Sequence, residues 1–135
     1  MNISATIQNS NQANKVRVAT NGLEKEMQIA GKPEGYGSSV NGGELLFLSL
    51  ATCFCNDIYR EATRRKMDIE SVTVTISGEF GLEGEPASNI TYQAQVLSIH
   101  HSSQEIAELI QQVDQVAEVH NTLRKGVSVT LKQTS

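Results

Sequence analysis

The stretch "GELLFLSLATCFCNDIYREATRRK", residues 43–66, decides the fold because it predicts one long helix. Its first half, up to Cys55, is apolar on almost every face, whereas its second half is amphipathic. A helix that is apolar all round is buried, and a charged end reaches water. In a single domain of this size, such a helix can pack mostly against one sheet face, which covers only one of its sides. The apolar half therefore predicts that a second subunit covers the rest.

The segments on either side of this helix predict strands and one further helix. Residues 14–30 predict two short strands joined by the hairpin signal Asn21-Gly22, and the glycine-rich residues 31–43 predict a loop. Alternating apolar residues predict strands at 71–80 and 89–99, helical spacing predicts a helix at 103–119, and "VSVTL", residues 127–131, predicts a closing strand. Because strands and helices come in blocks, we expect an α+β fold in a single domain over residues 1–135.

Composition and charge narrow the classes of function. The 135 residues are 39% hydrophobic and 19% charged with a net charge of −4, so electrostatics gives no case for nucleic acid or an anionic membrane surface as a partner. The N-terminus lacks the basic start and apolar core of a signal peptide, and no apolar run approaches the roughly 18 residues that a membrane helix needs. We expect a cytoplasmic protein, in which thiols stay reduced unless they do chemistry.

Two cysteines, Cys53 and Cys55, lie on the predicted helix. They could form a metal site or a disulfide, act as single reactive thiols, or pack in the core. Their C-x-C spacing and the dispersed histidines His100, His101 and His120 do not match a zinc pattern, so we expect no metal and no cofactor. Positions two apart on a helix point about 200° away from each other, so the two cysteines are poor partners for a disulfide. Single-thiol chemistry and core packing both remain open for each cysteine.

The charges near Cys53 do not favour a reactive thiolate. Cys53 lies about nine residues into the helix, beyond the reach of the N-terminal dipole, and Asp57 follows one turn later. A neighbouring carboxylate disfavours a thiolate, so any activation must come from a cation or from hydrogen-bond donors elsewhere in the fold. Three arginines, Arg60, Arg64 and Arg65, are typical of a solvated helix end rather than of a substrate clamp.

Two segments, in this order along the chain, resemble one known family. Residues 41–80, "NGGELLFLSLATCFCNDIYREATRRKMDIESVTVTISGEF", resemble the central helix and following strand of the OsmC/Ohr family of osmotically inducible and organic-hydroperoxide-resistance proteins. Residues 119–131, "VHNTLRKGVSVTL", resemble the family's C-terminal segment, which usually reads Cys-Pro-Val-(His/Ser)-x-Thr-Leu before a Gly-Val strand. The first 40 residues match the family only in their strand-hairpin-strand character.

The resemblance implies an intertwined α+β homodimer with curved antiparallel sheets packed around long central helices. It also implies a thiol peroxidase site at the dimer interface. In that chemistry a thiolate attacks a peroxide oxygen and becomes a sulfenic acid, while water or an alcohol leaves. A second cysteine then resolves the sulfenic acid as a disulfide.

Carried over by position, the resemblance places the attacking cysteine at Cys53. The family's activating Glu falls on Gly43, so the adjacent Glu44 becomes the candidate for that role. The resolving cysteine falls on Ala117 and the proline after it falls on Glu118. The resolving thiol of the family is therefore missing from this chain.

Two further residues match the family less well. Cys55 has no counterpart there, and its apolar surroundings favour core packing, although it remains a candidate second thiol. Arg17 lies near the position of the family's activating Arg but is out of register. The resemblance therefore does not settle which residue would activate Cys53.

Two hypotheses follow for the function. In the first, the protein is an OsmC-like thiol peroxidase that reduces organic hydroperoxides, or a similar small electrophile, through Cys53, with an external thiol as the reductant. In the second, it is a non-catalytic OsmC-fold dimer, small-molecule-binding or structural, that has lost the resolving cysteine. Retention of Cys53 favours the first hypothesis, whereas Ala117 and the shifted Glu44 favour the second.

Overall fold

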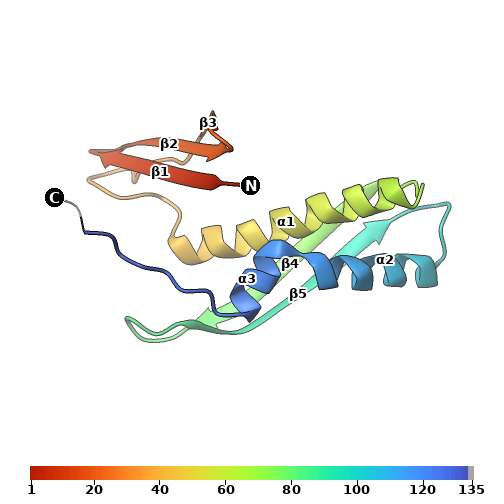
Figure 1. Ribbon diagram of the computed structural model, residues 1–135. Coiled ribbons are helices and arrows are strands. Elements are labelled where there is room, and N and C mark those ends of the chain that lie inside the picture. Colours follow the sequence, from red (N-terminus) through yellow and green to blue (C-terminus); the bar gives the residue numbers. More distant parts are fainter. Residues whose placement is uncertain (134–135) are drawn as a thin grey trace. The chain divides into compact units, whose positions relative to one another are not determined.

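The computed structural model describes residues 1–133 of the chain, with strands and helices in separate blocks (Figure 1). The elements, in chain order, are β1 (Ile3–Ser10), β2 (Ala13–Thr20), β3 (Leu23–Met27), α1 (Gly42–Arg64), β4 (Ser71–Phe80), β5 (Ala87–Leu97), α2 (Ser103–Val116) and α3 (Glu118–Arg124). The predicted α+β fold class is confirmed. The chain forms two compact units that divide after Leu45, near the start of α1, and the single domain stays a prediction.

The first unit is an antiparallel sheet in the strand order β1-β2-β3. The predicted hairpin joins β2 to β3. Both of its turn residues, Asn21 (φ 50°) and Gly22 (φ 81°), have the left-handed conformation that a type I′ turn requires. The sequence analysis did not predict β1, which pairs with β2 from Ile3 to Ser10. The N-terminal sheet is therefore one strand larger than predicted.

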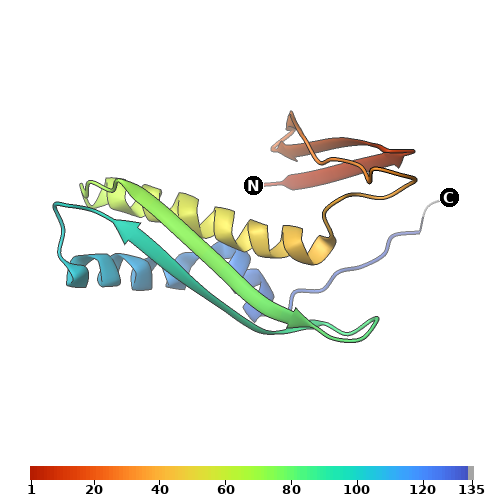
Figure 2. The same cartoon turned by 180° about the vertical axis from the view of Figure 1, so that it is seen from behind.

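In the second unit, α1 and α2 pack against the same face of the antiparallel hairpin β4–β5, as the two views in Figures 1 and 2 show. The centre of this core consists of Phe54 and Ile58 from α1 and Leu109 and Val113 from α2, which are all fully buried. Burying a side chain of this kind contributes about 1.5–3 kcal/mol to the free energy of unfolding. This layer of helices on a sheet holds α1 in place.

The strands predicted at 71–80 and 89–99 are confirmed by β4 and β5, with β5 shifted by two residues. Val72 and Val74 of β4 pair in register with Val96 and Ala94 of β5, and all four pack against the core. Successive residues of a strand point to opposite faces, so this register places an apolar row under the helices. The period-two pattern in the sequence is the cause of this packing.

The helix predicted at 103–119 is confirmed only as far as Val116. Its start is fixed by a capping box, in which Ser102 Oγ accepts from the Glu105 N–H at 3.2 Å and Glu105 Oε2 accepts from the Ser102 N–H at 2.7 Å. At Ala117 the backbone is extended (φ −66°, ψ 105°), and a second helix, α3, begins at Glu118. The prediction of one continuous helix is therefore wrong. The break was not foreseen because neither Gly nor Pro, the residues that usually interrupt a helix, occurs there.

The closing strand predicted at 127–131 is also wrong, since the described chain has no strand between α3 and residue 133. A strand needs a neighbour that shares its backbone hydrogen bonds, and among the described strands none pairs with this segment. Val129 and Leu131 are 99% and 93% exposed. The alternating pattern thus marks a segment that lacks a partner within the described chain.

Other apolar side chains are uncovered as well. Leu48 on α1 is 60% exposed, and on the first sheet Ile7 and Leu23 are 52% and 79% exposed. The exposure of Leu48 is what we expect of a central helix that one chain cannot cover, and the second subunit stays a prediction. Within residues 1–133, no helix combines the length and the apolar character that crossing a bilayer requires.

Candidate functional site

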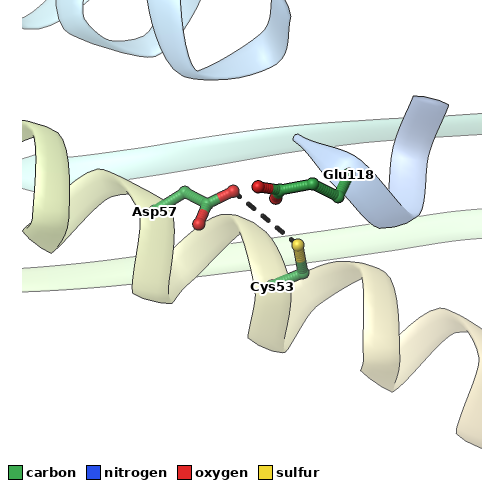
Figure 3. Close-up of side chains that lie close together, drawn as sticks. All are labelled: Cys53, Asp57 and Glu118. Atoms are coloured by element: carbon green, nitrogen blue, oxygen red, sulfur yellow. Dashed lines mark hydrogen bonds between the residues drawn. The ribbon is translucent and has the colours of Figure 1, made fainter. Parts of the chain in front are cut away.

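The thiol of Cys53, in the middle of α1, lies beside a buried carboxylate. Cys53 Sγ donates a hydrogen bond to Asp57 Oδ2 at 3.7 Å, and Asp57 is only 4% exposed. Glu118, the first residue of α3, brings its carboxylate to the same place (Figure 3). One atom from each of these three side chains lies within 4.8 Å of the others. A thiol and two carboxylates therefore share one site.

Local structure explains why these groups meet. Cys53 and Asp57 are four residues apart, so they lie one turn apart on the same side of α1. The break at Ala117 starts α3 where Glu118 reaches α1 (Figure 3). Arg60 joins the group, because its Nη2 lies 2.7 Å from Asp57 Oδ1 and 3.7 Å from Glu118 Oε1. We call these four residues, Cys53, Asp57, Arg60 and Glu118, the Cys53 cluster.

The surroundings of Cys53 keep its thiol protonated. Burial raises the pKa of Cys53, and the negative charges of Asp57 and Glu118 raise it further. The backbone N–H of Val119, next to Glu118, acts against this and lowers the pKa. The balance is a pKa above the ordinary value of 9.0, so the sulfur carries its proton at neutral pH. The site thus presents a thiol rather than a preformed thiolate.

The carboxyl group of Asp57 is a stronger base than an ordinary aspartate. Burial raises its pKa, and the charge of Glu118 adds to this, whereas the positive charge of Arg60 and the hydrogen bond from Cys53 lower it. The net pKa lies above the ordinary value of 3.8. A carboxylate with a raised pKa, in hydrogen-bond contact with a thiol, is placed to take up the thiol proton.

The other residues predicted for the site lie elsewhere. Cys55 lines a separate hollow of about 270 Å³ together with Ala51, Thr52, Asn56 and Val74. Its thiol therefore has different neighbours from the thiol of Cys53, as the helix geometry predicts.

Glu44 is occupied at the start of α1. Its Oε1 accepts from the Asn41 N–H at 2.9 Å, and Asn41 Oδ1 accepts from the Glu44 N–H at 2.8 Å, which forms a reciprocal cap. Glu44 precedes Cys53 by nine residues, about 13 Å along a helix axis. Arg17 lies on β2, in the first unit. The roles predicted for Glu44 and Cys55 stay predictions.

The expectation that Asp57 disfavours a thiolate at Cys53 is confirmed, because its charge raises the pKa of Cys53. Sequence reasoning did not foresee that Asp57, Arg60 and Glu118 form one cluster with Cys53. The spacing of Cys53, Asp57 and Arg60, four and then three residues apart, was a usable signal that they share one helix face. Glu118 carried no such signal, because its place depends on the break before α3.

Cys53, Asp57 and Glu118 also carry donor atoms that a metal ion could use. The guanidinium of Arg60 already supplies a positive charge to both carboxylates, and the thiol keeps its proton at neutral pH. A metal would have to displace Arg60 and that proton. The expectation of no metal and no cofactor therefore stays a prediction.

Comparisons with known proteins converge on one family. A family model described as OsmC-like protein matches residues 35–132. No curated protein matches the chain.

Several solved structures share the fold. An OsmC-like protein from Mycoplasma pneumoniae is similar with a TM-score of 0.60 and 20% identity, over 91% of this chain and 86% of the other. An organic hydroperoxide resistance protein from Legionella pneumophila is similar with a TM-score of 0.58 and 17% identity, over 92% and 90%. One from Elizabethkingia anophelis, solved with thiocyanate bound, is similar with a TM-score of 0.61 and 19% identity, over 92% and 89%. Since the family model spans most of the sequence, the chain belongs to the OsmC-like protein family.

Proposed function

We propose that this protein reduces organic hydroperoxides with the thiol of Cys53, and that Asp57 is the base that activates this thiol. The observation that carries the proposal is the hydrogen bond from Cys53 Sγ to Asp57 Oδ2, at 3.7 Å, with a carboxyl group whose pKa is raised. Membership of the OsmC-like family supports it. Structural relatives named organic hydroperoxide resistance proteins, from Legionella pneumophila and Elizabethkingia anophelis, support the choice of substrate.

The chemical step uses one proton twice. The Asp57 carboxylate takes the proton from Cys53 Sγ as the sulfur attacks the terminal oxygen of the hydroperoxide. The O–O bond breaks, and the leaving alkoxide takes the proton back from Asp57 and departs as an alcohol. The sulfur is oxidised by two electrons to a sulfenic acid, and the hydroperoxide is reduced by the same two electrons. Asp57 thus acts first as a base and then as an acid.

Arg60 and Glu118 hold this base in place. Arg60 pairs with Asp57 Oδ1 at 2.7 Å, which leaves Oδ2 to face the thiol. Arg60 is therefore a positioning residue, and the same Nη2 atom also lies 3.7 Å from Glu118 Oε1.

An external thiol completes the proposed cycle. Ala117, at the position of the family's resolving cysteine, is fully buried in the core, and Cys55 lines a hollow that does not include Cys53. A small thiol would attack the sulfenic sulfur of Cys53 to give a mixed disulfide and water. A second thiol would then release Cys53 and leave as the small-molecule disulfide.

We also propose that the working form is an intertwined homodimer. The exposed apolar residues Leu48, Val129 and Leu131 support a second copy that covers the central helix and the C-terminal segment. Light scattering should give twice the chain mass of 14.7 kDa. A mass equal to that of one chain at micromolar concentration would contradict the dimer.

The alternative is a non-catalytic binding protein of the same fold. The raised pKa of Cys53, caused by burial and by Asp57 and Glu118, favours this alternative, because a protonated thiol is a weak nucleophile. The two functions differ in whether Cys53 is oxidised at all.

The test is intact-protein mass after stoichiometric cumene hydroperoxide or hydrogen peroxide. We expect the wild type and Cys55→Ser to gain one oxygen and Cys53→Ser to gain none. An added small thiol should convert the oxidised form to a mixed disulfide at Cys53. An unmodified wild-type chain, or oxygen found at Cys55 instead, would rule out the peroxidase proposal and leave the binding alternative.

A further inference from the structure

The second unit contains a pocket that shares no residue with the Cys53 cluster. Its volume is about 260 Å³. It lies between α1, the hairpin β4–β5 and α3, and its lining residues are Leu50, Ile76, Ile90, Tyr92, His120, Leu123 and Arg124. We call it the His120 pocket. The walls are aliphatic apart from Tyr92, His120 and Arg124, so the pocket is apolar with a few polar groups, as small-molecule sites usually are.

His120 is the unusual member of this wall. It is only 5% exposed, and within residues 1–133 neither ring nitrogen has a hydrogen-bond partner. Its ring packs against the rings of Tyr92 and Phe54, with centroids 4.6 Å and 5.5 Å away. Buried polar groups are nearly always hydrogen-bonded, so an unpaired one that lines a pocket indicates a partner that comes from outside the chain.

Burial lowers the pKa of His120, and the positive charge of Arg124 lowers it further, while Asp114 acts against both. The imidazole is therefore neutral at pH 7. A neutral imidazole carries one N–H donor and one nitrogen acceptor, and here both are unused.

The other polar groups of the wall are already paired. The Tyr92 hydroxyl donates to Asp114 Oδ1. Arg124 donates to Asp114 Oδ1 at 2.6 Å, to the Asp114 carbonyl at 3.0 Å and to Asn121 Oδ1 at 3.1 Å. The charges of Arg124 and Asp114 offset each other, so the wall offers no uncompensated charge to an ionic ligand. The parts of the pocket that remain available to recognise a ligand are therefore its apolar surface and His120.

We propose that the His120 pocket binds a small uncharged alcohol or phenol, whose hydroxyl hydrogen-bonds to His120 and whose apolar body contacts Leu50, Ile76 and Ile90. A hydroxyl suits either ring nitrogen, because it can donate or accept, and the ring must turn to meet it because both nitrogens are closed to solvent in the unliganded chain. The volume of about 260 Å³ lies just below the roughly 300 to 1,000 Å³ of sites for drug-sized molecules, so the ligand is smaller than those. This inference does not depend on the thiol chemistry.

The test compares two probes that differ by one hydroxyl, p-cresol and toluene, titrated into the full chain and followed by NMR. We expect p-cresol to bind at least about fivefold more tightly, since one hydrogen bond contributes about that factor. The side-chain nitrogen resonances of His120 should shift with p-cresol and not with toluene. Equal affinities, an unshifted His120 resonance, or the absence of binding by either probe would overturn the proposal.

Variants on one strand locate the site. Ile90→Phe fills the pocket, whereas Leu97→Phe adds the same bulk to β5 at a position outside it. We expect Ile90→Phe to weaken the binding of p-cresol at least tenfold and Leu97→Phe to leave the affinity for p-cresol unchanged. Equal effects of the two variants would place the probe elsewhere and overturn the proposal.

His120→Phe tests the hydrogen bond by itself. We expect it to bring p-cresol and toluene to equal affinity, and a retained preference for p-cresol would overturn the role of His120. If this variant does not fold, the wild-type resonance shift of His120 and the Ile90→Phe and Leu97→Phe pair decide the question.

Discussion

The Cys53 cluster and the His120 pocket differ in how their polar side chains are paired. In the cluster, every polar group has a partner within the chain: the thiol faces Asp57, and Arg60 faces both Asp57 and Glu118. In the pocket, both nitrogens of His120 lack a partner among the described residues, although the ring is as well buried as Asp57. One site has paired charges, and the other has an imidazole without a hydrogen-bond partner among the described residues.

The two sites come from neighbouring residues of the same short helix. Glu118 and His120 are two positions apart on α3, so their side chains point about 200° away from each other. One side of α3 therefore brings a carboxylate to α1, and the other side closes an apolar pocket. Its density of charge makes the cluster suited to proton transfer, whereas its low charge makes the pocket suited to a neutral ligand.

The largest effect should come from removing the base of the cluster. We expect Asp57→Asn to slow the oxidation of Cys53 by cumene hydroperoxide about 100-fold at pH 7, since general base catalysis contributes a factor of about 10² to 10⁴. Stopped-flow kinetics against Asp68→Asn, an exposed aspartate, provides the control. If Asp57 only suppressed the thiolate by its charge, its removal would speed the oxidation, and that result would contradict the proposed role.

Replacing Arg60 should have a smaller effect, which is a loss of stability. Arg60→Ala leaves the buried Asp57 without its cation. Breaking a buried pair costs about 3–5 kcal/mol, but Arg60 is 48% exposed, so we expect a loss of about 1–2 kcal/mol in the free energy of unfolding.

The matched control for Arg60 is Arg64→Ala, on the same helix. The side chain of Arg64 is 67% exposed and pairs with Glu61 at 3.5 Å, so its loss should change the free energy of unfolding by less than about 0.5 kcal/mol. Urea denaturation at pH 7 measures both variants. Equal losses would show that Arg60 does not hold the cluster together.

Patterns local in sequence predicted most of the fold. The apolar run from Leu45 to Cys55 predicted the central helix, the alternation at 71–80 predicted β4, and Asn21-Gly22 predicted the hairpin turn. Each of these depends on residues within about ten positions, so a single sequence carries the information. The closing strand failed because a strand depends on its neighbour, which the pattern at 127–131 cannot reveal.

The sites were harder to predict because they depend on contacts between distant segments. The resemblance to the family pointed to Cys53, but Glu118 lies 65 residues later and reaches the thiol only because α2 breaks at Ala117. His120 was considered only as a metal ligand, and nothing in its sequence context shows that both ring nitrogens are buried without partners. Burial and unpaired groups are properties of packing, which local patterns do not specify.

The smallest effect should appear in how stability changes with pH, and it isolates the pocket from the cluster. Burial holds the pKa of His120 below its ordinary value of 6.5. The unfolded chain therefore takes up a proton near pH 6.5, whereas the folded chain keeps the imidazole neutral to lower pH. The stability linked to this histidine is fully present above pH 6.5 and is lost as the pH falls from 6.5 toward the folded pKa.

We therefore expect His120→Phe to flatten the fall in the free energy of unfolding between pH 7 and 5.5. The difference in slope cannot exceed about 1.4 kcal/mol per pH unit, the limit for one proton. The raised pKa of Asp57 acts with the opposite sign, because a folded state that binds the proton more tightly gains stability as the pH falls. Asp57 is present in both proteins, so its contribution cancels in the comparison.

Urea denaturation across this range, with the exposed His100→Gln as the control, measures the slopes. Parallel pH profiles for wild type and His120→Phe would show that the imidazole takes up its proton in the folded pocket, which would contradict a buried neutral histidine.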